Sequence, residues 1–103
     1  MRIPNLILKT LYSAEDMCDA VVDFCHKNEE LLPEEYYSKD CRMREIMRAL
    51  DWEWQDADWD NREDTKRVFE LTKGVLREAS STLAKLKALV SASKQEIEYC
   101  DFA

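Results

Sequence analysis

The sequence is poor in the residues that make turns, with one glycine and two prolines in 103 residues. Sheets and loops depend on glycine, proline and asparagine for their turns, so this scarcity excludes a turn-rich all-β fold. Hydrophobic residues make up 46% of the chain, which excludes a chain that is disordered by composition. We therefore expect a single all-α domain over residues 1–103, built from a few long helices.

Signals for export, membrane insertion and common types of catalysis are also lacking. The N-terminal segment MRIPNLILKTLYSAEDM has too short an apolar run to cross a membrane, and it has no cleavage site of the secretory kind. The four cysteines include no CxxC pair, which favours buried, reduced thiols over metal ligands. No GxSxG motif occurs, and a single glycine cannot make a phosphate-binding loop. The sequence thus predicts a cytoplasmic protein that is not an enzyme and has no catalytic residues, metal or cofactor.

Hydrophobic periodicity predicts an antiparallel bundle of three long helices, at about 5–31, 34–57 and 61–100, with the C-terminal helix longest. In the first helix, steps of four and three separate the apolar or small residues Ile7, Leu11, Ala14, Cys18, Val21 and Cys25. Asn5 is the candidate N-cap of this helix, and Pro33 separates it from the second. Asp60 or Asn61 can cap the third helix, and Asp60 with Glu63 matches a capping box.

The third helix reads as heptads and raises a question of length. Its a positions are Phe69, Leu76, Leu83, Val90 and Ile97, and its d positions are Thr65, Thr72, Ala79, Leu86, Ser93 and Cys100. Unbroken, this helix would span roughly 60 Å, whereas a compact chain of this size has a radius of gyration of about 13 Å. Either the bundle is elongated, or the helix overhangs and pairs with a second copy, or it bends or breaks near residue 80. The seam of such a homodimer would comprise Leu76, Leu83, Leu86, Val90 and Ile97.

Charge is distributed unevenly around the net value of −7. Residues 51–64 carry seven acids and one arginine, whereas residues 65–94 carry seven bases and two acids. One interpretation is internal, with an acidic helix packed beside a basic one. The other is an acidic surface that attracts a basic protein partner. Direct binding of nucleic acid is disfavoured, because the acidic segments would repel a polyanion.

All three tryptophans lie inside the acidic segment 51–64. Trp54 continues the apolar stripe of the second helix, whereas Trp52 and Trp59 share a different face. The rings could close one end of the bundle, with Trp59 as a hydrophobic staple. Alternatively, exposed rings could anchor a partner, because tryptophan and tyrosine dominate binding hot spots and surrounding acids steer a basic protein. The candidate partner-binding residues are Trp52, Glu53, Asp56, Asp58, Trp59, Asp60, Tyr36 and Tyr37.

The only histidine, His26, follows a row of acids formed by Asp16, Asp19 and Asp23 on the first helix. Such a row could hold magnesium or set up an acid–base pair. A solvated polar face opposite the Cys18 and Cys25 stripe is the favoured interpretation.

We therefore favour a small, acidic, non-enzymatic interaction protein that binds and inhibits a basic protein partner, for example one that binds nucleic acid. Its composition is similar to that of immunity proteins, antitoxins and phage-encoded inhibitors. The main alternative is a helical dimerisation or adaptor module that uses the C-terminal heptad helix.

An enzymatic alternative rests on the segment Glu53-Trp54-Gln55-Asp56. This segment resembles the ExxD half of the signature of the magnesium-dependent all-α nucleotide pyrophosphohydrolases. The EExxE half is missing, because Glu29 and Glu30 are followed by Leu31, Leu32 and Pro33. The resemblance implies that Glu53, Asp56 and an acid of the first helix would converge on one metal ion.

Overall fold

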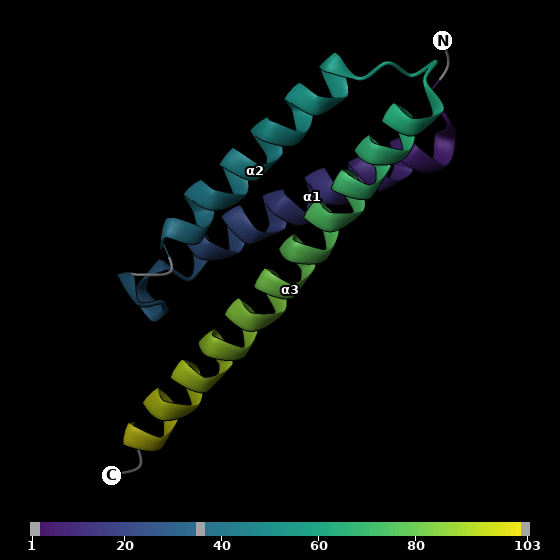
Figure 1. Cartoon of the computed structure of the whole chain (residues 1–103). Helices are drawn as coiled ribbons and strands as arrows, with labels where there is room; N and C mark the ends of the chain where they lie inside the picture. Colours follow the sequence, from purple (N-terminus) through teal and green to yellow (C-terminus); the bar gives the residue numbers. More distant parts are fainter. Residues whose placement is uncertain (1–2, 35–36, 102–103) are drawn as a thin grey trace.

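The structure is a computed structural model that describes residues 3–34 and 37–101; in 37–41 and 96–101 it describes the backbone alone. The described chain is all-α, as the sequence predicts. Its elements are α1 (Asn5–Lys27), the short 3-10 helix η1 (Glu29–Leu31), α2 (Tyr37–Asp56) and α3 (Arg62–Asp101). Figure 1 shows α2 running back alongside α1, and α3 crossing α1 before extending beyond the other helices at its C-terminal end.

Helix α1 begins without the predicted side-chain cap. Pro4 occupies the N-cap position, and its carbonyl accepts hydrogen bonds from the N–H groups of Ile7 and Leu8 at 3.1 and 3.2 Å. Asn5, the predicted cap, is instead the first helical residue. The helix ends at Lys27, earlier than residue 31, and Asn28 is its C-cap. Both the side chain and the backbone N–H of Asn28 donate to the Phe24 carbonyl, which satisfies an acceptor of the last turn. Residues 29–31 continue as the 3-10 turn η1.

Helix α3 begins at a cap supplied by Asn61. The Asn61 Oδ1 atom accepts the backbone N–H groups of Glu63 at 3.0 Å and Asp64 at 3.1 Å, which satisfies two N–H groups that the first turn leaves free. Of the two predicted caps, Asn61 rather than Asp60 thus takes this position. The bounds of α2 and α3 otherwise differ from the predicted ones by three residues at most.

Helix α3 is continuous, so the break considered near residue 80 does not occur. Gly74 and the segment Ser80-Ser81-Thr82 are all helical. The molecule is consequently elongated, with extents of 65 × 21 × 16 Å and a radius of gyration of 17.4 Å. Packing explains the continuity, because the fully buried Ala79 and Leu86 flank Ser80-Ser81-Thr82 and anchor this part of α3 in the core, so tertiary contacts outweigh the low helix propensity.

The core lies mainly between α1 and α3, which form the most extensive helix pair, and α2 completes it with Met43 and Leu50. Cys18 and Cys25 are buried there as free thiols, in agreement with the sequence analysis. On α3 the d positions Thr72, Ala79 and Leu86 are all fully buried, whereas the a positions Leu76 and Leu83 are half-buried. The small side chains of Thr72 and Ala79 on α3, and of Ala14 and Cys18 on α1, are buried, and small buried residues on both helices suit a close approach of the two.

Candidate functional site

The three tryptophans occupy different environments, which answers the question that their position in an acidic segment raises. The Trp52 side chain is 66% exposed, whereas Trp54 and Trp59 are half-buried. Trp52 lies two residues from the inward-facing Leu50 and Trp54, which is a rotation of about 200° around the helix. It therefore projects from the side of α2 that faces away from the core.

Trp54 and Trp59 pack against each other where α2 connects to α3. Their ring centroids are 4.8 Å apart, with the planes tilted by 53°. The Trp54 Nε1–H donates to the Thr72 hydroxyl at 3.0 Å, and this fully buried hydroxyl donates in turn to the Val68 carbonyl at 2.7 Å. Every polar group of this chain of contacts is thus satisfied. These two rings close one end of the molecule.

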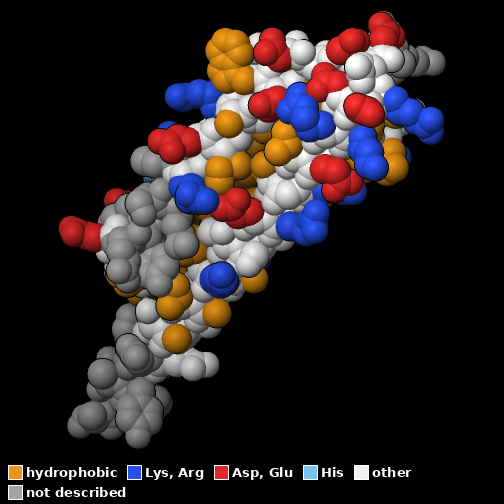
Figure 2. Space-filling model, viewed as in Figure 1, with side chains coloured by type: hydrophobic (Ala, Val, Ile, Leu, Met, Phe, Trp, Pro, Cys, Tyr) orange, Lys and Arg blue, Asp and Glu red, His pale blue; other side chains and the backbone are white. Residues whose placement is uncertain are grey.

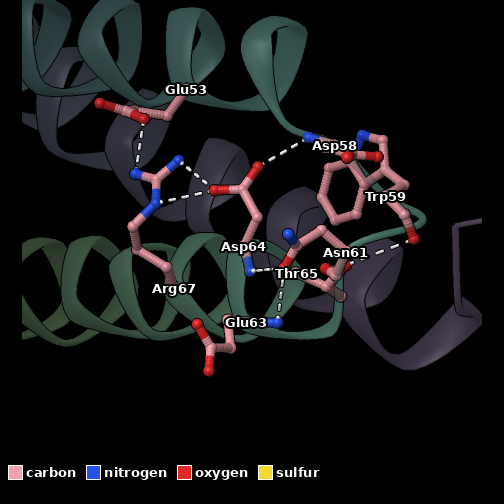
Figure 3. A network of polar contacts seen from close by, with 8 residues as sticks. All are labelled: Glu53, Asp58, Trp59, Asn61, Glu63, Asp64, Thr65 and Arg67. Atoms are coloured by element: carbon pink, nitrogen blue, oxygen red, sulfur yellow. Dashed lines mark hydrogen bonds and ion pairs between the residues drawn. The ribbon is translucent and has the colours of Figure 1, made fainter.

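A polar network holds the α2–α3 connection (Figure 3). One carboxylate oxygen of Asp64 accepts the Asp58 backbone N–H at 2.6 Å, and the other accepts two N–H groups of Arg67 at 2.8 and 3.0 Å. Arg67 also donates to the Glu53 carboxylate at 2.7 Å, which joins α3 to α2. The Asp58 N–H, followed by the Arg67 guanidinium, lowers the pKa of Asp64. The connection is therefore braced from both helices.

Acidic side chains that are not needed by this network remain at the same end. The side chains of Asp51, Asp56, Asp58 and Asp60 are all exposed. The Asp58 Oδ1 atom accepts only a local backbone N–H, that of Asp60 at 3.1 Å. Figure 2 shows acidic side chains gathered at this end of the molecule, over the α2–α3 connection. We call the exposed set Asp51, Trp52, Asp56, Asp58 and Asp60 the acidic end.

The acidic end continues onto α1, which sequence reasoning did not detect. Burial, together with the charges of Asp51, Asp19 and Asp16, raises the pKa of Glu15. Carboxylates of α1 therefore lie near a carboxylate of α2 that is far away in sequence. Between these helices lies a groove of about 300 Å³, lined by Cys18, Asp19, Val22, Met43, Arg44, Met47, Arg48 and Asp51.

The predicted partner-binding residues are only partly brought together. Glu53 is half-buried and forms an ion pair with Arg67, and Trp59 is half-buried and packs against Trp54. Tyr36 lies outside the described residues, as does the side chain of Tyr37. The Tyr37 backbone begins α2, and thus lies roughly 22 Å along the helix axis from Trp52.

The residues considered for metal binding are dispersed. In the described part of the chain, no three His, Cys, Asp or Glu side chains are placed to hold one metal ion. The convergence of Glu53, Asp56 and an α1 acid, which the hydrolase resemblance implies, is therefore not observed. In the row on α1, Asp23 instead pairs with Lys27 at 2.9 Å, and His26 Nε2 lies 3.4 Å from an Arg44 nitrogen.

The residues considered for a dimer seam lie mostly in the intramolecular core. Leu86 and Val90 are buried, and the half-buried Leu83 packs against the same core cluster. Leu76 is half-buried, and the side chain of Ile97 lies outside the described part. Within a single chain, this face of α3 is thus largely used to pack α1.

The site belongs to an elongated three-helix protein with one braced, acidic end. Comparisons with protein-family models, with curated proteins and with solved structures found no match to this chain. Among the helices that the structure describes, none combines the length and the apolar character needed to cross a bilayer.

Proposed function

We propose that this chain is a non-enzymatic interaction protein that binds a basic region of another protein through its acidic end and inhibits it by covering that region. The observation that carries the proposal is the position of Trp52. A large aromatic side chain is 66% exposed among carboxylates, on a helix whose end is braced by Arg67. Nothing in the core requires a tryptophan there.

In this proposal the Trp52 ring supplies most of the binding energy, and its acidic neighbours supply the attraction to a basic surface. Burying an exposed tryptophan supplies contact area at little entropic cost, and such residues dominate binding energy. Exposed carboxylates contribute less to affinity but accelerate association with a basic surface and select against acidic ones. Because the connection is braced, little ordering free energy is spent when the partner binds.

Site-specific photocrosslinking in cells tests the proposal. A photoreactive amino acid at position 52 should crosslink to a partner with a basic surface. Position 6 is the matched control, because Leu6 is also 66% exposed but lies on α1. With the captured partner purified, Trp52→Ala should weaken binding by at least about tenfold, and added salt should slow association. Crosslinks at position 6 alone, or to an acidic partner, would contradict the proposal.

A homodimer through α3 is the second candidate, and one observation favours it. The C-terminal end of α3 extends beyond α1 and α2 (Figure 1), so part of this heptad helix lies beside none of the other described helices. Light scattering distinguishes this candidate, because it requires a dimeric mass in the absence of any partner.

A further inference from the structure

A second surface lies beside the acidic end, in a groove between α2 and α3. The groove has a volume of about 240 Å³ and is lined by Ile46, Ala49, Leu50, Glu53, Leu71 and Val75. Leu71 is 42% exposed there, and Figure 2 shows hydrophobic side chains in the furrow between the two helices. Pockets for small molecules measure roughly 300–1,000 Å³. This smaller, mostly aliphatic groove fits the side chains of another protein better than a separate ligand.

The only glycine of the chain lies on α3, between two residues that line this groove. Gly74 is one helical turn from Leu71 and adjacent to Val75, in the interior of the unbroken helix α3. A glycine at such a position weakens a helix by about 0.8–1.0 kcal/mol relative to alanine. A Cβ atom built at Gly74 would meet nothing within 4 Å. The fold of the described chain therefore does not require glycine here, and the open space is available to a molecule that approaches from outside.

The charges around the groove indicate the kind of molecule. Two of the arginines near the groove are already paired, Arg42 with Glu78 at 3.1 Å and Arg67 with Glu53 at 2.7 Å. A third, Arg77, is exposed on α3 one helical turn from Gly74 and donates to the Lys73 carbonyl. Glu45 and Asp56 are exposed on the outer side of α2, and no described side chain forms an ion pair with either. The α2 side of the border is therefore acidic. An approaching surface with basic side chains would compensate it.

We propose that the groove and Gly74 form a docking site for a basic amphipathic helix of the partner protein. Aliphatic side chains of that helix insert between α2 and α3 beside Leu71, and its backbone passes close to Gly74. Its lysine or arginine side chains reach Glu45 and Asp56. This docking mode rests on the proposed function and specifies the kind of segment that the partner presents.

A synthetic peptide tests the docking site directly. The probe is a helix of leucine, alanine and lysine with all lysines on one face, and its control has the same composition in scrambled order. Binding is followed by amide chemical shifts and by fluorescence polarisation. The amphipathic peptide should change the amide chemical shifts of residues around Leu71 and Val75, whereas the scrambled peptide should leave them unchanged. Equal binding of both peptides, or no binding, overturns the proposal.

Substitutions at position 74 report on close approach. Gly74→Leu should weaken peptide binding by about tenfold, because its side chain fills the open space. Ala84→Leu adds a similar side chain to another exposed position of α3 and should leave binding unchanged. The unfolding midpoint of each variant verifies that it folds. A Gly74→Leu variant that folds and binds the peptide normally overturns the docking site.

Two further results separate this inference from the proposed function. If Trp52→Ala weakens peptide binding and Gly74→Leu does not, the docking site is overturned and the acidic end is supported as the binding surface. Binding that depends on Gly74 but not on Trp52 would support the docking site and remove Trp52 as the anchor. A dimer in light scattering that Gly74→Leu dissociates would assign the groove to a second copy and overturn the proposed occupant.

Discussion

The hydrogen bond from Trp54 to Thr72 allows a quantitative test of how the closed end of the molecule is stabilised. Thr72→Val replaces a fully buried hydroxyl by a methyl group of similar shape. The Val68 carbonyl loses a second donor but keeps its helical N–H partner. The Trp54 Nε1–H loses its acceptor, which the structure places 3.0 Å away.

The expected loss of stability follows from the asymmetry of buried hydrogen bonds. Leaving a buried donor unsatisfied costs about 1–3 kcal/mol. Trp54 is only half-buried, so water can reach part of the indole, and the lower part of that range applies. The added methyl group returns some stability through burial. We therefore expect Thr72→Val to lower the free energy of unfolding by about 1 kcal/mol, which corresponds to roughly 4–8 °C in Tm for a domain of about this size.

Urea unfolding followed by far-UV circular dichroism measures the effect without relying on the tryptophans. The matched control is Thr82→Val on the same helix, because Thr82 is half-buried and none of the described contacts is a hydrogen bond to its hydroxyl. That variant should remain within about 0.5 kcal/mol of the wild type. A double-mutant cycle with Trp54→Phe should give a coupling energy of about 1 kcal/mol. Equal stabilities of the two valine variants, or zero coupling, would refute the reasoning.

Three further predictions concern the caps, the network and the core. Asn61→Ala should lower the free energy of unfolding by about 1 kcal/mol, because the helix loses its cap. Asn61→Asp should keep most of the stability that the cap contributes, and denaturant titration measures both variants. Asp64 has a lowered pKa in the folded state, so its contribution is present above the unfolded value of about 3.9 and is lost as the pH falls through the folded value. The stability difference between the wild type and Asp64→Asn should consequently narrow in acid, and a constant difference would contradict this. Burial raises the pKa of the Cys18 thiol to about 11, so peptide mapping should find it unalkylated at neutral pH in the folded protein and alkylated in urea.

Local patterns in the sequence determine much of this architecture. The scarcity of glycine and proline and the steps of three and four predict the helical class, and the buried face of α1 contains the apolar residues of that periodic stripe. The cap at Asn61 is likewise a local feature, because its side chain bonds only to N–H groups two and three residues away. Such features are predictable because both partners lie within one helical turn.

The heptads of α3 show where local information becomes insufficient. Periodicity identifies Leu83 and Val90 as members of one helix face, but it does not state which neighbour covers that face. The structure covers it with α1 and centres the contact on the smaller d row. Close approach of two helices depends on side chains from both, and α1 lies far away in the sequence.

The candidate surface was likewise determined only in part by the sequence. The sequence shows that the three tryptophans lie among acidic residues, but tertiary contacts give each tryptophan a different environment. Thr72 and Trp59 hold Trp54 in place, while Trp52 remains exposed. Arg67 removes Glu53 from the free acids, and α1 adds carboxylates near Asp51.

The helices, the Asn61 cap and the overall charge were thus determined by the sequence itself, because they depend on residues or on neighbours within a few positions. The continuous course of α3, the separation of Trp52 from the other tryptophans and the groove between α2 and α3 were decided only by the tertiary structure. Each of these features depends on how helices that are distant in sequence cover one another. A periodic pattern specifies which residues share a face, whereas packing decides which faces meet and which remain open.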